Sequence, residues 1–358
     1  MGTSRTLNPS DSAEPSDSRA SRLLARISNS RLGRLANRYR LLLPVGSFAL
    51  GLGSYFLVQR HAALAQWLTG LMLVGWVALL FEGLLCRLLA RWLGERVPQI
   101  LVRYGAQALH QETLFFVLPF FLATTTWLSM QAGFTVLLIC CAIASAIDPI
   151  YYEIIAPRRW LFFGFHALTL FAALLTGGPI FLSLTTGDSI AIASVAMAIC
   201  ALPSFNDVIR ASGWGRWLLM ALLSIALGLG AWQARYWIPP ATLTVQKMVI
   251  TPTLNTSTRV PGKDQDTIPV SQLGNGLYAF SAIKAPRGLH QGVLHVWTHD
   301  GQEVHRIALD IDGGLREGGY RSWSHVNHFG DNPVGEWRVA VITDDGQLIG
   351  AERFEVTR

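Results

Sequence analysis

Five acidic and histidine side chains lie inside or beside long apolar runs of this sequence, where ionisable groups are uncommon. They are Glu82, His110, Glu112, Asp148 and His166. An ionisable group at membrane depth costs about 2.5–3.5 kcal/mol, so each of them is a candidate for a functional role. Carboxylates combined with imidazole rings would suit a divalent cation, a proton relay or acid–base catalysis on a lipid headgroup.

Structural roles compete with this interpretation. Glu82 can pair with Arg87 or with a neighbouring helix, and the other four candidates lie close enough to the membrane interface to be hydrated. No phosphate-binding loop, dinucleotide-binding, zinc-protease or nucleophile-elbow motif occurs in a supporting context. The sequence therefore favours a protein that is not an enzyme and carries no cofactor, with these five residues as its catalytic candidates.

Aromatic side chains in the last third of the chain form a second candidate site. Trp297, Tyr320 and Trp323 could make an exposed platform for a glycan or a protein partner. Packing in the core of a small domain is the alternative for such rings. These three residues are therefore the candidate partner-binding residues of the chain.

Histidines are also concentrated in this region. Six of the nine lie there, namely His290, His295, His299, His305, His325 and His328. His295 and His299 are four positions apart, about 13 Å along a strand, which is too far for two ligands of one ion. Without a partner from another strand, such as His305 or His325, the sequence predicts no metal site here.

The first five candidates belong to a series of apolar runs that could cross a membrane. Each run is within a few residues of the roughly 20 needed to cross about 30 Å of hydrocarbon. The runs cover residues 41–58, 64–86, 113–129, 132–147, 160–183, 189–206 and 216–233. Very short connections join the third run to the fourth and the fifth to the sixth, which predicts two antiparallel hairpins.

Arginine residues flank these runs unevenly. Eight arginines precede the first run, and others follow the second, fourth and sixth runs, while the opposite loops contain only Arg60 and Arg235. Because positive residues mark the cytoplasmic side, the N-terminus is expected in the cytoplasm and the C-terminus outside. The net charge of +6 therefore reflects membrane topology, and we exclude nucleic acid as a partner.

The residues before the first run have a different composition. Residues 1–20 are rich in Ser, Pro and Asp, which predicts disorder, and residues 21–40 place arginines among leucines and isoleucine. The second part is expected to be a basic juxtamembrane segment or an amphipathic helix on the inner leaflet. We treat residues 1–40 as a cytoplasmic segment outside the folded domains.

The pattern changes again after residue 241, to short alternating segments separated by turn residues. Seven of them are predicted to be strands: 243–250, 276–283, 293–299, 304–311, 320–326, 336–342 and 352–357. Asp300-Gly301 and Asp345-Gly346 are typical of tight hairpins. Trp337, Val339 and Val341 share one face of a strand, as a half-buried strand requires. Seven strands in this length predict an immunoglobulin-like sandwich.

Several of these segments resemble a known bacterial domain. They are 295–301 (HVWTHDG), 320–324 (YRSWS), 335–339 (GEWRV) and 345–350 (DGQLIG). They are similar to a C-terminal β domain of unknown function that ends multi-span inner-membrane proteins of Gram-negative bacteria. Residues 111–119 (QETLFFVLP), with Asp148-Pro149, resemble the uncharacterised membrane domain that often precedes it. The resemblance implies an inner-membrane location and a periplasmic β domain, and it supplies no activity.

Together the sequence predicts a membrane all-α bundle of about seven transmembrane helices over residues 41–238. An all-β immunoglobulin-like sandwich over residues 242–358 follows, on the periplasmic side. The expected function is binding or sensing of a periplasmic protein or glycan through this sandwich, with the lipid bilayer around the bundle. A small transporter or a lipid-handling enzyme that uses a polar site on the cytoplasmic side is the alternative.

Overall fold

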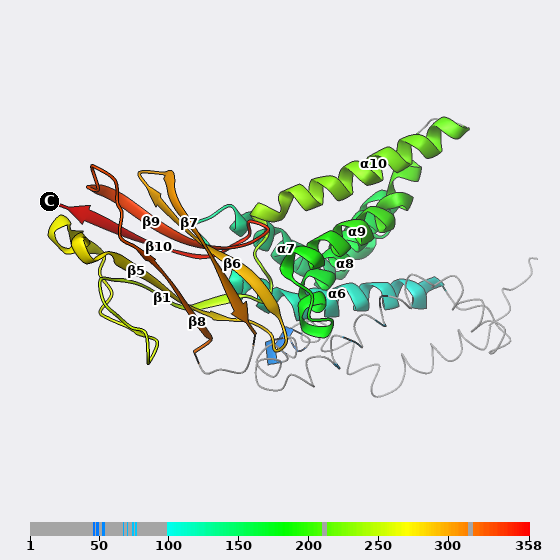
Figure 1. Ribbon diagram of the computed structural model, residues 1–358. Helices are drawn as coiled ribbons and strands as arrows, with labels where there is room; N and C mark the ends of the chain where they lie inside the picture. Colours follow the sequence, from blue (N-terminus) through cyan, green and yellow to red (C-terminus); the bar gives the residue numbers. More distant parts are fainter. Residues whose placement is uncertain are drawn as a thin grey trace, which may run out of the picture.

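The computed structural model describes residues 46, 48–49, 52–53, 67, 70, 74, 76, 99–209, 213–313 and 318–358. Figure 1 shows helices α6 to α10 at one end of the molecule and the β strands at the other, with the C-terminus at the far tip of the β domain. Residues 1–40, Glu82 and most of the first two apolar runs lie outside the described residues.

Five α-helices form the described part of the bundle. They are α6 (Gln99–Thr124), α7 (Gln131–Ala146), α8 (Arg159–Phe181), α9 (Thr186–Val208) and α10 (Trp214–Gln233). The last four lie close to the predicted runs. Helix α6 begins well before residue 113. The sequence analysis missed its early turns, because they mix polar residues with Leu and Ala and so do not form a continuous apolar run. Those turns are helical with a buried polar face that carries Gln107 and His110.

Helix α9 begins inside the loop that the sequence predicts, because a side chain caps it. Thr185 Oγ1 accepts a hydrogen bond from the Asp188 amide at 3.1 Å and donates one to the Asp188 carboxylate at 2.7 Å. Thr185 is therefore the N-cap of α9, and its hydroxyl satisfies a backbone donor at the start of the helix. The short turn packs α8 against α9 (Figure 1), as the predicted hairpin requires.

Three helical segments in the described part are long and apolar enough to cross a membrane. They are Arg159–Phe181, Thr186–Phe205 and Trp214–Trp237. The buried share falls from 67% in the first to 33% in the second and 11% in the third, so α8 is the internal helix and α10 is the most exposed. The described residues therefore support three membrane-spanning helices, and the seven that the sequence predicts are not supported.

The β domain contains all seven predicted strands. They are β1 (Thr244–Thr251), β5 (Leu277–Lys284), β6 (His290–His299), β7 (Gln302–Asp312), β8 (Tyr320–Val326), β9 (Gly335–Thr343) and β10 (Leu348–Thr357). Three short strands are additional: β2 (Leu254–Asn255), β3 (Val260–Pro261) and β4 (Thr267–Pro269). Strands of two or three residues are too short to show an alternating pattern, which is why the sequence does not reveal them.

The strands form two main sheets. One has the order β1-β5-β8 and the other the order β4-β10-β9-β6-β7, while β2 and β3 form a small separate ribbon. Trp337, Val339 and Val341 are fully buried on the predicted face. Both hairpin predictions are confirmed, because Gly301 and Gly346 adopt φ values of +83° and +87° at the two reversals. Glycine reaches this left-handed conformation without the steric cost that a side chain brings.

The β9–β10 hairpin contacts the chain that follows α10, namely the 3-10 turn η2 (Ala234–Trp237) and Ile238. Gln347 donates a hydrogen bond from Nε2 to the Ile238 carbonyl at 3.0 Å, and Arg235 donates from Nε to the Asp345 carbonyl at 3.0 Å. Ile238 also belongs to the main apolar cluster of the bundle. The segment that connects the two domains therefore packs against the helical bundle and against the β domain.

Two further hydrogen-bond contacts tie the β domain to helix starts. Gln131, at the start of α7, donates from Nε2 to the Leu348 carbonyl at 2.8 Å. The Gln291 side-chain oxygen accepts from the Thr186 amide at 2.9 Å and from its hydroxyl at 3.1 Å. The helix ends that meet the β domain are those that the sequence analysis predicts on the same side of the membrane as the C-terminus.

Candidate functional site

Two histidines and a tyrosine form a continuous polar chain inside the helical bundle. His110 Nε2 lies 3.0 Å from His166 Nδ1, and His110 Nδ1 lies 2.9 Å from the Tyr151 hydroxyl. His110 and Tyr151 are completely buried, and His166 is 6% exposed. Each of the three side chains thus finds its hydrogen-bond partner within the group.

Three separate elements bring these side chains together. His110 lies on α6, His166 on α8, and Tyr151 on a π-helical turn, η1 (Ile150–Ile155), between α7 and α8. The Ala156 amide donates to the Tyr151 carbonyl at 2.8 Å, which closes the wide turn. Single π-helical turns are frequent at functional sites because they redirect one side chain out of the regular spacing.

Aromatic rings surround the two imidazoles. The Trp76 ring centroid is 4.6 Å from that of His166 and 5.9 Å from that of His110. Phe165 packs edge-on to His110 at 5.2 Å. Trp76 is itself fixed, because its Nε1 donates to Thr113 Oγ1 at 3.0 Å. The rings hold both imidazoles in one orientation inside an apolar enclosure.

The geometry permits two arrangements of protons along this chain. If Tyr151 donates to His110 Nδ1, His110 donates from Nε2 to His166 Nδ1. In the opposite arrangement His166 donates from Nδ1 to His110 Nε2, and His110 donates from Nδ1 to the tyrosine oxygen. The first arrangement changes to the second when Tyr151 passes its proton to His110 Nδ1 and His110 passes its Nε2 proton to His166 Nδ1. For all three groups to stay neutral, a new proton must reach the Tyr151 oxygen and one must leave His166 Nε2, which is the chemistry of a relay.

The other predicted candidates do not join this chain. Asp148 accepts a hydrogen bond at 2.8 Å from Nε2 of Gln107, which lies one helical turn before His110. Glu112 is exposed on α6. The structure thus brings together His110 and His166 from the five candidates, places Asp148 at the flank, and leaves Glu112 outside. Glu82 belongs to the undescribed residues.

Sequence reasoning missed Tyr151, Trp76, Gln107 and Thr113, because it considered only charged and imidazole groups. Gln107 and His110 are three positions apart, which places them on one face of a helix, and that spacing was a usable signal. No local signal marks Tyr151, which lies in an ordinary apolar stretch, IYYEII.

The three aromatic candidates of the β domain do not form one surface. Trp297 is fully buried and packs against Phe329 and Phe354, so the core-packing alternative applies to it. Tyr320 packs towards the core, while Trp323 packs against a cluster on the opposite face of β8. Positions 320 and 323 differ by an odd number, and successive strand residues point to opposite faces.

His295 forms a buried polar bridge between the two sheets. Its Nε2 lies 2.9 Å from Ser281 Oγ, and its Nδ1 lies 2.9 Å from Ser324 Oγ. Trp297 donates from Nε1 to the same Ser324 oxygen at 3.0 Å. Burial lowers the pKa of His295 to about 4. Its partners Ser281 and Ser324 lie on β5 and β8, across the core from β6, so this serine–histidine contact joins the two sheets.

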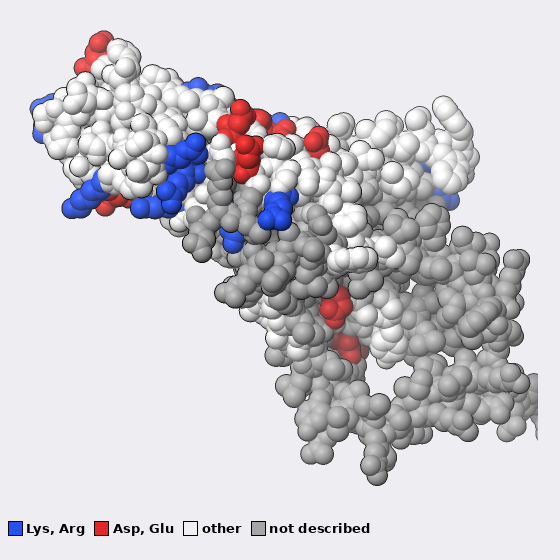
Figure 2. Space-filling model, turned by 60° about the horizontal axis from the view of Figure 1, so that its bottom comes forward, with Lys and Arg blue, Asp and Glu red and all other residues white. Residues whose placement is uncertain are grey.

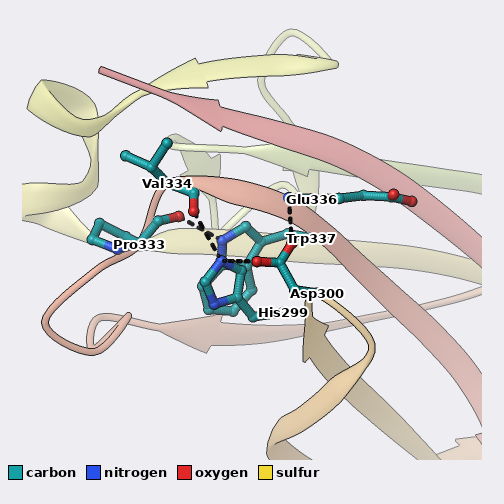
Figure 3. A network of polar contacts seen from close by, with 6 residues as sticks. All are labelled: His299, Asp300, Pro333, Val334, Glu336 and Trp337. Atoms are coloured by element: carbon teal, nitrogen blue, oxygen red, sulfur yellow. Dashed lines mark hydrogen bonds and ion pairs between the residues drawn. The ribbon is translucent and has the colours of Figure 1, made fainter.

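His299 belongs to a different network at the other end of β6 (Figure 3). Its ring stacks on Trp337 with the centroids 4.5 Å apart, and its Nε2 lies 3.2 Å from the Val334 carbonyl. Asp300 accepts from the Glu336 amide at 3.0 Å. Within the described ranges, no three His, Cys, Asp or Glu side chains are placed to hold a metal ion.

Two known protein families match most of the chain. A family model described as "Family of unknown function (DUF5924)" matches residues 22–279. The chain belongs to this family. A second model, "Protein of unknown function (DUF2914)", matches residues 290–356, which span most of β6 to β10. These matches agree with the resemblance to an uncharacterised protein that ends in a β domain.

A crystal structure of an immunoglobulin-like protein from Pseudomonas aeruginosa is similar to this DUF5924 chain. The sequence identity is 15%, the TM-score is 0.23, and the similarity covers 32% of this chain and 96% of that one. A search of curated proteins finds no match. The first match ends at residue 279, inside β5, and the second begins at residue 290, the start of β6, so both matches cover strands of the β domain.

Proposed function

We propose that this protein is a multi-pass protein of the bacterial inner membrane, with a cytoplasmic N-terminus and a periplasmic β domain. The uneven distribution of arginines supports this orientation. The contacts of the β domain with the starts of α7 and α9 and with the chain just after α10 agree with the expected crossings, because they put these three helix ends on the same side as the β domain. A topology reporter fused after Arg358 should be active only outside the cytoplasm, and cytoplasmic activity alone would refute the orientation.

The proposed function is binding of an envelope partner by the β domain, with transmission of the bound state to the helices. The observation that carries this proposal is the hydrogen-bonded contact between the two domains. A module that served only as a tethered binder would need no more than a flexible linker. Here side chains of each domain bond to main-chain atoms of the other, and Gln131, Gln291 and Gln347 are all at most 4% exposed.

Buried amides of this kind make the contact sensitive to displacement. A buried polar group that loses its partner costs about 1–3 kcal/mol, so a shift of the β9–β10 hairpin changes the free energy of the helix ends that it contacts. A ligand that favours one position of the hairpin therefore favours one arrangement of the helices.

Complementation of a deletion strain tests this proposal. We would compare Gln131→Ala combined with Gln347→Ala against the control Gln302→Ala, which changes an exposed glutamine at the other end of the sheet. Growth under a panel of envelope stresses is the readout, with membrane insertion checked by immunoblot. Loss of complementation in the double variant alone is expected. Full complementation by an inserted double variant would refute transmission through this contact.

A second candidate function is proton movement within a small transporter or a lipid-handling enzyme. The His166, His110 and Tyr151 chain favours it, because three buried groups lie within hydrogen-bond distance in line. In proteoliposomes with an internal pH dye, His110→Phe should abolish a proton flux that Glu112→Gln, an exposed change, preserves. Equal fluxes in wild type and His110→Phe would eliminate this candidate.

A further inference from the structure

A pocket of about 350 Å³ lies on the outer face of the β1-β5-β8 sheet. Its lining includes Lys247 from β1, Ala282 and Phe280 from β5, Arg321 from β8 and Pro261 from the β2–β3 ribbon. Phe280 and Ala282 are buried, whereas Lys247 and Arg321 are exposed. The pocket therefore has an apolar floor and two cationic side chains at its rim.

Strand register explains this arrangement. Lys247 pairs with Ala282, and Ala282 pairs with Arg321 on its other side, so the three residues form one row across the sheet. Neighbouring strands are about 4.8 Å apart, which separates the Cα atoms of Lys247 and Arg321 by about 10 Å. Because the residue between them is small, two long cationic side chains flank an open space.

The described residues offer no carboxylate to these two cations. Arg321 donates from Nη1 to the Arg259 carbonyl at 3.4 Å, and neither Arg321 nor Lys247 is ion-paired within the described part of the chain. Figure 2, viewed from the side of this sheet, shows Lys and Arg side chains on the β domain. The pocket thus has a positive charge that an anionic ligand could neutralise.

The pocket also lies near the end of the β domain that meets the helices. Lys247 is three residues beyond Thr244, the first residue of β1, or about 10 Å along the strand. Tyr236 and Trp237, at the end of the last apolar helix, are 46% and 56% exposed. Exposed aromatic residues at such a position are typical of the membrane–water interface.

We propose that this pocket binds the phosphate of an anionic phospholipid headgroup at the surface of the membrane in which the bundle lies. Lys247 and Arg321 contact the phosphate oxygens, since a guanidinium and an ammonium are the usual partners of phosphate in proteins. The apolar floor formed by Phe280 accepts the first carbons of the lipid. The proposal rests on the membrane location, and it does not require transmission through the contact between the domains.

Titration of the full chain in detergent with short-chain phosphatidylglycerol tests the proposal, with short-chain phosphatidylcholine and inorganic phosphate as parallel ligands. Saturable binding of phosphatidylglycerol is expected, at least fivefold tighter than that of the other two. Lys247→Gln and Arg321→Gln should each weaken it about fivefold, as expected for one basic residue at an anionic surface. Ala282→Leu fills the space while it keeps both charges, so it should also weaken binding.

Arg353→Gln is the matched control, because Arg353 is an exposed basic residue on the other sheet. Its affinity should equal that of the wild type. Equal losses in Arg353→Gln and Arg321→Gln would show a general charge effect and overturn the proposal. If inorganic phosphate binds as tightly as phosphatidylglycerol, the pocket recognises free phosphate and not a lipid headgroup, and the proposal is overturned. The cell complementation described above is unaffected by either result.

Discussion

The pH dependence of β-domain stability should depend on one buried side chain, His295. Burial lowers the pKa of this histidine from 6.5 to about 4. Above pH 6.5 the imidazole is neutral in both the folded and the unfolded chain, and its contribution to stability is complete. As the pH falls below 6.5 the unfolded chain takes up a proton that the folded chain excludes, so the free energy of unfolding decreases.

The magnitude follows from the two pKa values. One unit of pKa difference corresponds to 1.36 kcal/mol, so the loss between pH 6.5 and pH 4 amounts to about 3 kcal/mol. Below pH 4 the folded histidine is protonated as well and the decrease from this residue ends. The hydroxyls of Ser281 and Ser324 lie 2.9 Å from the two ring nitrogens, and the neutral ring donates to one of them and accepts from the other. On protonation, the hydroxyl that donates to the ring must turn to accept instead.

Urea titrations between pH 4.5 and pH 7.5 measure this effect. The protein would carry 5-fluorotryptophan, and the ¹⁹F signal of Trp337 would report unfolding of the β domain alone, because Trp337 lies in its core. The His295→Gln variant should be less stable at pH 7.5, and its stability should fall less steeply with decreasing pH. The difference from wild type cancels the contributions of carboxylates.

His290→Gln provides the control, because this histidine side chain is 82% exposed beside Asp312. Its pH profile should be parallel to that of the wild type. If His295→Gln and wild type lose stability equally between pH 6.5 and pH 4.5, the buried neutral imidazole is not the cause, and the reasoning is refuted.

Three further predictions concern the packing of this protein. Expression of residues 290–358 alone should give an unfolded chain by circular dichroism, because β1 and β5 are missing, whereas residues 241–358 should fold. Gly346→Val should destabilise the contact between the domains, measured as faster proteolysis, because a Cβ there would overlap the Tyr236 ring and the φ value is +87°. Gly301→Val, which has open space around it, should strain only its own turn. Thr185→Ala should lower the thermal stability of the bundle by about 1 kcal/mol, as loss of a helix cap does, and an unchanged melting temperature would contradict this.

The division between the two family models has a structural consequence. Strands β1 and β5 lie before residue 290, and β8 lies after it, yet the three form one sheet. The first match holds β1, the beginning of β5, and β4, an edge strand of the other sheet, whereas the second match holds β8 together with β6, β7, β9 and most of β10. Neither matched segment contains all the strands that bury Trp297 and Trp337.

Much of the fold is determined by local patterns in the sequence. Apolar runs predict α7 to α10 because burial in lipid or in a bundle demands continuous apolar surface, and alternation predicts all seven long strands because successive side chains face opposite sides. Both hairpins are marked by Asp-Gly pairs, since the reversal needs a left-handed residue. These signals act over a few residues, so the sequence alone is sufficient to reveal them.

The site and the pocket were decided only by tertiary structure. His110, Tyr151 and His166 come from three elements, and the π-helical turn that directs Tyr151 towards His110 has no local signature. Likewise, the row of Lys247, Ala282 and Arg321 depends on the register of three strands that are far apart in the chain. The sequence listed the ionisable residues, but contacts between distant segments depend on packing, and this is why it could not distinguish the buried His110 from the exposed Glu112 two positions away.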